Sequence, residues 1–262
     1  MISEELLNDI ISTYNELEND LEFTGFSEPS VSFYEDYPEP GHSKINLTKA
    51  VEWWTTKQGE NGDYKKYLKP EFESLIKDLT KIIENYDSGI ETELKDNLGK
   101  THTQWGPIPH RWAAIHSKGR DKTLDVQFFI NLTSKGLRVG ICVSHQRNYS
   151  NSWKSFLNRL LKRKELIFEE IKNLEDLGYT FINTKKEDYA NKSDGTVIIC
   201  NDTEEMYNHV RDAAQFDIVF FVGKENLDKS NLIIDILECF VQTRKLYQLL
   251  QPSKFNKKRE IV

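Results

Sequence analysis

The spacing of apolar residues changes along the chain, from a helical period near both ends to a two-residue alternation in the middle. Near the N-terminus, apolar residues recur every three or four positions, the pattern of an amphipathic helix. This pattern covers three segments: residues 1–22, 47–56 and 64–86. Pro70 predicts that the third helix begins near it, because proline is tolerated in the first helical turn but not in the interior. The Pro-, Gly- and Ser-rich residues 27–46 predict a loop with a short strand at 31–34.

The alternating pattern begins after residue 110 and predicts a series of short strands. The predicted strands are 111–116, 124–132, 137–144, 179–183, 195–200 and 216–222. The sequence Thr133-Ser134-Lys135-Gly136 predicts a tight hairpin turn between the second and third of these strands. Pairing through a short turn is antiparallel, so we expect a mostly antiparallel sheet.

Three helical segments interrupt or follow these strands. They are residues 150–177, which Gly178 would end, 203–214, which Asp202 or Thr203 would cap with Glu205 nearby, and 228–250. We therefore predict an α+β fold with a central, mostly antiparallel sheet of about five strands, flanked by long helices and preceded by a helical N-terminal part. The predicted divisions are an N-terminal helix and loop (1–46), an α+β recognition domain (47–252) and a basic tail or linker (253–262).

Bulk properties exclude several classes of protein. The chain has 262 residues, enough to bury a core, and no apolar run approaches the ~18–20 residues of a membrane span. The acidic, amphipathic N-terminus is unlike a secretory signal or a transit peptide. Cys142, Cys200 and Cys239 are odd in number and lie in apolar runs, which predicts buried free thiols and a cytoplasmic location. No paired cysteine motif indicates zinc.

The charge is distributed unevenly. Residues 99–163, which we call the basic island, hold twelve Lys or Arg and two acids, a local net charge of +10. The whole chain carries −7, so the remainder carries −17. A basic, aromatic-rich segment in an acidic protein indicates an anionic partner.

Nucleic acid is the anion that suits this composition. The predicted contacts to the nucleic-acid backbone are Lys118, Arg120, Lys122, Arg138 and Arg147, because cations of this segment fall mostly in turns or at strand ends. The predicted base-stacking candidates are Trp105, Trp112, Tyr149 and Trp153. The alternative is that Trp112 and Trp153 belong to the core and that the cations form a solvated face. Of the pair Trp53-Trp54, we expect one indole to pack inward and the other to be exposed or to lie against the sheet.

No enzymatic motif is complete. Gly99-Lys100-Thr101 lacks the upstream glycine of a phosphate-binding loop, where this chain has Leu94. Asp87 followed by Glu93-x-Lys95 has the loose form of a metal-dependent nuclease site, but its polar setting predicts a charged loop. The histidines match no standard metal set, and no nucleophile elbow is present. We therefore predict no catalytic residue, metal or cofactor.

The basic island also carries a recurring order of turns and strands. Its segments are Trp105–Pro109, Arg111–Ile115, Asp125–Ile130, Leu137–Gly140 and Ser144-His145. Together with the closing helix that ends in Leu246–Leu250, these segments resemble the N-terminal specificity region of McrB-like, modification-dependent restriction proteins. The similarity covers roughly residues 47–252 and consists of turns and strands without a catalytic signature.

This resemblance implies a DNA-recognition domain of a restriction or phage-defence system. In that family the N-terminal part reads double-stranded DNA, often a methylated or otherwise modified base turned out of the duplex, while a GTPase module translocates and a nuclease subunit cuts. The chain has no GTPase motif, so the resemblance implies an isolated specificity domain or a stand-alone relative that is not itself an enzyme. Two alternatives stay open: a metal-dependent nuclease, and a protein-interaction module whose acidic part contacts a basic partner.

Overall fold

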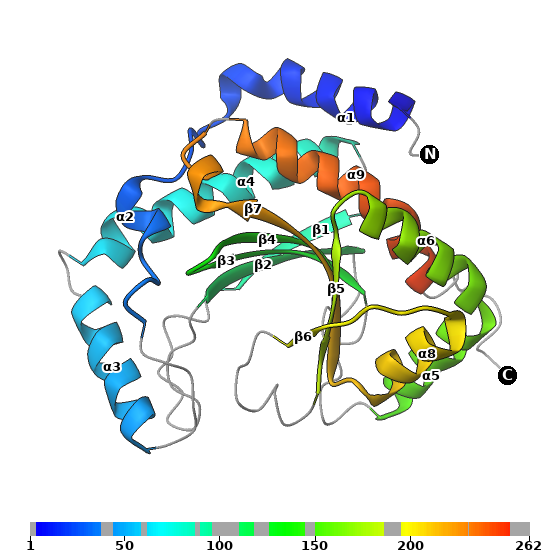
Figure 1. Ribbon diagram of the computed structural model, residues 1–262. Coiled ribbons are helices and arrows are strands. Elements are labelled where there is room, and N and C mark those ends of the chain that lie inside the picture. Colours follow the sequence, from blue (N-terminus) through cyan, green and yellow to red (C-terminus); the bar gives the residue numbers. More distant parts are fainter. Residues whose placement is uncertain are drawn as a thin grey trace, which may run out of the picture.

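A curved antiparallel sheet, with helices packed on one of its faces, is the frame of the protein (Figure 1). The computed structural model describes residues 4–37, 44–58, 62–86, 90–95, 110–117, 126–144, 150–185, 195–229 and 231–251. Within these ranges seven strands lie in the order β1-β2-β3-β4-β7-β5-β6, and every neighbouring pair is antiparallel. The strands are β1 (Ile90–Lys95), β2 (His110–Ser117), β3 (Gln127–Thr133), β4 (Gly136–Ser144), β5 (Thr180–Thr184), β6 (Thr196–Val197) and β7 (Gln215–Gly223). The predicted α+β class and antiparallel sheet are confirmed.

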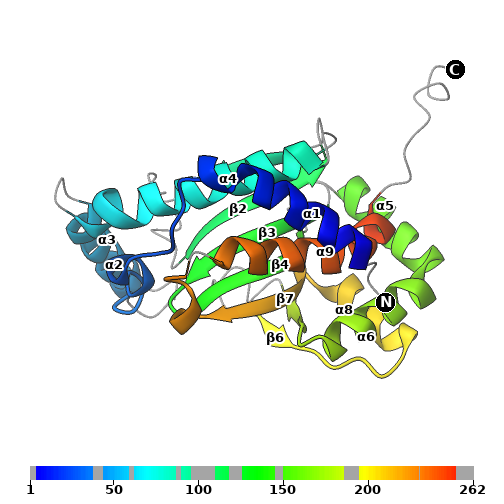
Figure 2. The same cartoon turned by 90° about the horizontal axis from the view of Figure 1, so that it is seen from above.

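The helices fall into three groups. α4 (Lys69–Tyr86) and α9 (Leu232–Leu250) cover one face of the sheet, and α1 (Glu4–Leu17) packs against these two helices on their side away from the sheet (Figures 1 and 2). α5 (Ser150–Lys162), α6 (Lys164–Asp176) and α8 (Thr203–Asp212) lie beside the end of the sheet that holds β5 and β6 (Figure 1). The short α2 (Glu28–Val31) and α3 (Lys44–Gln58) complete the N-terminal part. Pro70 is the second residue of α4, as predicted, and a π-helical turn (Tyr64–Leu68) precedes that helix.

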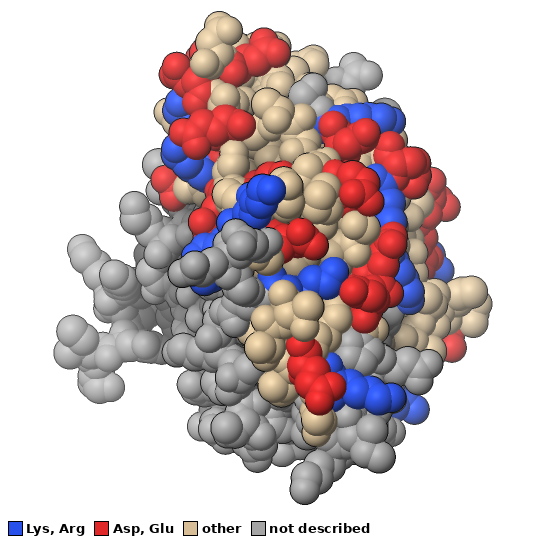
Figure 3. All heavy atoms as spheres, turned by 90° about the vertical axis from the view of Figure 1, so that its left-hand side faces the viewer, with Lys and Arg blue, Asp and Glu red and all other residues tan. Residues whose placement is uncertain are grey.

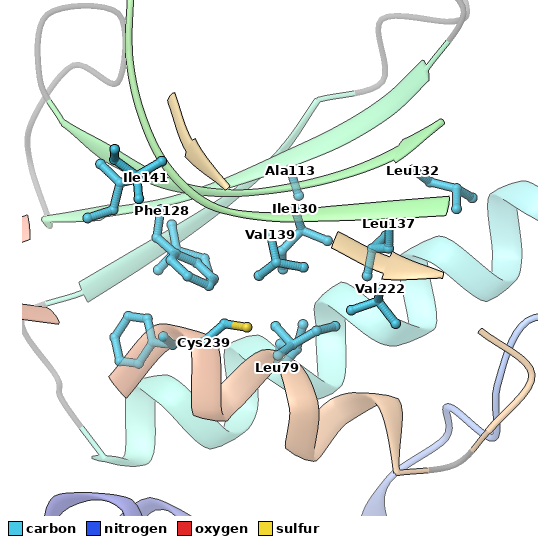
Figure 4. Packing of buried hydrophobic residues seen from close by; sticks show 14 of the residues in the cluster. Leu79, Ala113, Phe128, Ile130, Leu132, Leu137, Val139, Ile141, Val222 and Cys239 are labelled. Atoms are coloured by element: carbon cyan, nitrogen blue, oxygen red, sulfur yellow. The ribbon is translucent and has the colours of Figure 1, made fainter. Parts of the chain in front are cut away.

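The main core lies between the sheet and the helices above it. Phe128, Ile130 and Val139 point from the sheet toward α4 and α9 (Figure 4). The buried residues form one cluster that runs from Ile10 of α1 to Leu250 of α9. The N-terminal helix, which the sequence analysis placed in a separate segment, therefore shares its core with the rest of the molecule.

Two carboxylates of α4 hold the chain that follows α1. Asp78 is 1% exposed and accepts hydrogen bonds from the backbone N–H groups of Glu22 (2.8 Å) and Phe23 (2.7 Å). Glu71 accepts one from Ser27 (2.9 Å). An ionised acceptor makes such bonds stronger than neutral ones, so α4 fixes the path of the N-terminal segment.

The structure corrects three sequence predictions about elements. The strand predicted at 31–34 is wrong: Val31 ends the short helix α2, which has Pro29 in its first turn, where proline is tolerated, and a bend and turns follow at residues 32–36. The charged loop predicted around Glu93-x-Lys95 is wrong as well, because residues 90–95 form strand β1. The single helix predicted at 150–177 is two helices that break at Arg163, whose Nη1 donates to the carbonyl oxygen of Leu249 (2.7 Å) at the end of α9.

Several local predictions are confirmed. The β3–β4 hairpin pairs Thr133 with Gly136. Gly178, with a positive φ of 91°, lies just after α6 and ends the helical segment. Asp202 caps α8 by accepting from the backbone N–H groups of Glu204 and Glu205. All three cysteines are free and buried. Both Trp53 and Trp54 are buried, so the alternative in which one indole is exposed is wrong. The Trp53 indole donates to Asp36 (2.9 Å).

Candidate functional site

The face of the sheet opposite the main core carries an unusual set of polar side chains. Along β4, Leu137, Val139 and Ile141 enter the main core, so the alternating positions 138, 140 and 142 face the other way. The same reasoning applies to β2, β3 and β7. We call this surface the polar face and define it by Trp112, His116, Gln127, Asn131, Arg138, Cys142 and Asp217. A small apolar cluster of Phe129, Cys142, Ile182 and Val219 lies on the same face.

One row of residues crosses four strands of the polar face. The register pairs Trp112 of β2 with Asn131 of β3, Asn131 with Arg138 of β4, and Arg138 with Phe221 of β7. Trp112 is half-buried, Asn131 is 9% exposed and Phe221 is 43% exposed. The row therefore places a buried amide and a guanidinium between two aromatic side chains.

Arg138 is fixed by its neighbours. Its side chain is 11% exposed, and its Nη2 lies 3.3 Å from Oδ2 of Asp217. The guanidinium lies 6.0 Å from the ring centre of Phe129 and 5.8 Å from that of Phe221. Gly140, which lies between Arg138 and Cys142 along β4, has no side chain to occupy the intervening space. Arg138 can therefore reach Asp217, which pairs with Cys142.

Asp217 is the acidic centre of the polar face. It is 2% exposed, and Nε2 of Gln215 donates to both of its carboxylate oxygens, at 3.0 and 2.9 Å. Burial raises the pKa of Asp217, and the charge of Arg138 opposes that shift. Burial, and next the Asp217 charge, also raise the pKa of Cys142 well above its usual value. The Cys142 thiol therefore stays protonated and is not a nucleophile.

On strands β3 and β4 of this face, three polar side-chain atoms are buried and have no hydrogen-bond partner within the part of the chain that the structure describes. They are Oε1 of Gln127, Oδ1 of Asn131 and Nε of Arg138. An unsatisfied buried polar atom costs about 1–3 kcal/mol, so a native structure keeps few of them. Two of these atoms, on Asn131 and Arg138, belong to directly paired residues. The arrangement suits a ligand that supplies both an acceptor and a donor.

The structure brings together two of the site residues predicted from sequence, Trp112 and Arg138. Arg138 lies within a strand and is paired with Asp217, whereas the sequence analysis expected a cation at a turn or strand end. Trp153 lies in α5, but its side chain is outside the described residues. The remaining predicted residues also lie outside the described ranges: Trp105, Lys118, Arg120, Lys122, Arg147 and Tyr149.

The described cations of the basic island occupy several separate places. Arg111 is buried on the core side of β2, where its guanidinium lies 5.4 Å from the ring centre of Tyr64 and 5.3 Å from that of Phe72. Arg163 caps α9, Lys135 is exposed in the β3–β4 turn, and Lys154 is exposed on α5. On the face shown in Figure 3, acidic and basic residues are interspersed. Charge alone therefore does not outline a site among the described residues.

Sequence reasoning missed Gln127, Asn131 and Asp217. A signal was present, because each is a polar residue at an alternating position of an otherwise apolar strand. Glu93 and Lys95 were predicted in a charged loop but lie in strand β1. In the backbone register of β1 and β2, Glu93 pairs with Ala114 and Lys95 with Trp112. Among the described residues, no group of three or more His, Cys, Asp or Glu is placed to hold a metal ion.

Comparisons with known proteins add no assignment. The sequence matches no model of a protein family and no curated protein. In the described residues, no helix is both long and apolar enough to cross a membrane.

Proposed function

We propose that this chain is a DNA-binding specificity domain of a restriction or phage-defence system that reads a modified, flipped-out base. The observation that carries the proposal is the row Trp112–Asn131–Arg138–Phe221 on the polar face, with two unsatisfied polar atoms between two aromatic side chains. The restriction context rests on the resemblance to McrB-like specificity regions. The excess positive charge of the basic island supports an anionic partner.

A nucleobase fits the chemistry of this row. Proteins that read an extruded base stack it on aromatic or apolar side chains and hydrogen-bond its edge. Trp112 supplies a stacking surface, and the Asn131 amide offers both a donor and an acceptor. The partner in this proposal is double-stranded DNA, methylated or unmodified; if the chain is part of a McrB-like system, a GTPase module and a nuclease subunit are partners as well. The free, buried cysteines fit the cytoplasm as the location.

A binding titration tests the proposal. We expect the protein to bind duplex DNA with an affinity that falls as salt rises, because bound cations release counterions. Duplexes with unmodified cytosine and with 5-methylcytosine should be compared at each salt concentration by fluorescence anisotropy. Absence of binding to both duplexes at low salt would exclude the proposal.

Substituting Trp112 tests the assignment of the site within this proposal. We expect W112A to weaken binding by about 5- to 150-fold, the range that corresponds to about 1–3 kcal/mol for one stacked base. The matched control is Y207A, which removes a half-buried aromatic ring from α8, away from the polar face. Equal affinities of W112A and Y207A would place the base elsewhere.

The second candidate is a metal-dependent nuclease, which one observation favours. Glu93 and Lys95 lie two positions apart on strand β1, which pairs with β2, and not in the charged loop that the sequence predicted. Asp87, the other member of the motif, lies outside the described residues. Magnesium-dependent cleavage of plasmid DNA, abolished by E93Q, would establish this activity. Binding without cleavage would leave the specificity domain as the function.

A further inference from the structure

We infer that Arg138 is a specificity-determining contact to the edge of a nucleobase, held in place by Asp217, and that it does not bind the phosphate backbone. This inference rests on the proposed function, because it assigns a role within the same DNA-reading site. It also changes the role that the sequence analysis gave to Arg138.

The surroundings of Arg138 make it a poor phosphate contact. Phosphate contacts are made by cations that reach out into solvent and release counterions from the backbone. Arg138 is only 11% exposed at its side chain, and its charge is already opposed by Asp217 at 3.3 Å. Movement to a phosphate would leave Asp217, itself 2% exposed, without its cationic partner. Breaking a buried ion pair in this way is strongly unfavourable.

The same surroundings suit a base contact. The Asp217 carboxylate and the rings of Phe129 and Phe221 fix the guanidinium, so little side-chain freedom is lost when a ligand binds. Nε of Arg138 and Oδ1 of Asn131 have no partner within the described residues, and the two residues are directly opposite in the β3–β4 ladder. A ligand that satisfies both atoms must offer a hydrogen-bond acceptor to Nε of Arg138 and, beside it, a hydrogen-bond donor to Oδ1 of Asn131. Nucleobase edges have this arrangement.

Asp217 is then a positioning residue, which acts through Arg138. Gln215 donates two hydrogen bonds to its carboxylate, at 3.0 and 2.9 Å, and so orients it. Loss of the carboxylate would free the guanidinium to contact phosphates instead. Removing Arg138 and removing the Asp217 charge should therefore both reduce base discrimination, but they should have different effects on the salt dependence.

The test measures the dissociation constant and its salt dependence on duplexes that differ at one position. The duplexes carry cytosine, 5-methylcytosine, 5-hydroxymethylcytosine, adenine, guanine or thymine there. We expect R138M to reduce the ratio between the best and worst duplex by about 5- to 150-fold, the discrimination of a good base contact, with an unchanged salt slope. D217N should reduce the same ratio and steepen the slope by about 0.9, which corresponds to one added phosphate contact.

Two further variants control for charge and for folding. K135M removes an exposed cation from the β3–β4 turn and should leave base discrimination unchanged. The double variant R138M/D217L replaces the buried ion pair by apolar groups, an exchange that often preserves folding. Near-ultraviolet circular dichroism should match that of the wild type, while discrimination stays low.

The outcomes separate the inference from the proposed function. If the wild type binds no duplex at low salt, the proposed function fails. If the wild type binds and R138M keeps full discrimination or has a shallower salt slope, the inference alone fails. A wild type that binds all six duplexes equally overturns both the inference and the reading of a modified base, and leaves only DNA binding without base specificity.

Discussion

At the scale of single residues, the buried Asp217 makes the free energy of unfolding depend on pH. Burial raises the pKa of Asp217 in the folded protein above the ~3.9 of an unfolded aspartate. The folded state then binds more protons than the unfolded state between these two pKa values. The free energy of unfolding therefore falls as pH rises through this window, and it is constant above the folded-state pKa.

The D217N variant isolates this effect. Asparagine does not titrate, so the stability of the wild type relative to D217N should decrease as pH rises from about 4, where the unfolded aspartate ionises. Urea unfolding at pH steps from 4 to 8 measures the difference. D212N is the control, because Asp212 is exposed and its pKa is lowered by its hydrogen bonds with Arg211. Parallel stability curves for the wild type and D217N would contradict the raised pKa.

At the scale of elements, Gly140 sets the contact between the two central strands β4 and β7. A Cβ at this position would lie 2.0 Å from the carbonyl oxygen of Ile218, closer than real atoms approach. Gly178 is the matched control, because its φ is also positive (91°) but a Cβ there would meet only the side chain of Phe220 at 3.8 Å. The comparison separates backbone strain from steric contact.

We expect G178A to destabilise the protein by about 1–2 kcal/mol, the strain of a left-handed backbone. G140A should be more destabilising by about 1–3 kcal/mol, the range for overpacking a tight interior, because β4 and β7 must move apart. Urea unfolding of both variants measures this difference. Equal losses would mean that β7 yields to the extra methyl group without loss of pairing.

The elements also show where sequence reasoning succeeds and where it stops. The β3–β4 hairpin and α4 were predicted because turn chemistry, proline position and apolar spacing are local signals. β1 was missed because ETELK has little strand preference of its own and becomes a strand by pairing with β2. The break at Arg163 was missed because its partner, the Leu249 carbonyl, lies 86 residues away.

The same distinction applies to the site. Trp112 and Arg138 could be proposed as candidates because residue type and local charge are visible in the sequence. The ion pair of Arg138 was not predictable, because Asp217 is 79 residues further along the chain. Only the strand order, with β7 inserted beside β4, brings the two together.

At the scale of the whole molecule, the core decides whether residues 47–252 can fold alone. Several large side chains before residue 47 are buried in the common core. They are Ile10, Tyr14, Phe23, Phe26, Phe33 and Tyr34. Phe26 packs 6.4 Å from Phe72 of α4, and Phe33 packs 5.4 Å from Trp53 of α3, measured between ring centres. The aromatic contacts thus join the two sides of the predicted boundary at residue 46.

We therefore expect a fragment of residues 47–252 to lack a cooperative unfolding transition. Removing one buried aromatic side chain costs about 3–5 kcal/mol. Folded proteins are stable by only about 5–15 kcal/mol, so the loss of four or more such side chains, about 12 kcal/mol at the least, is comparable to or larger than the whole stability. Near-ultraviolet circular dichroism and urea unfolding of the fragment and the full chain measure the outcome. The control is the full chain with E5A and D9A, which alter exposed residues of α1 and should change stability by less than about 0.5 kcal/mol each. A fragment that unfolds cooperatively with native near-ultraviolet signal would restore the boundary at residue 46 and make α1 to α2 an appendage of a domain formed by residues 47–252.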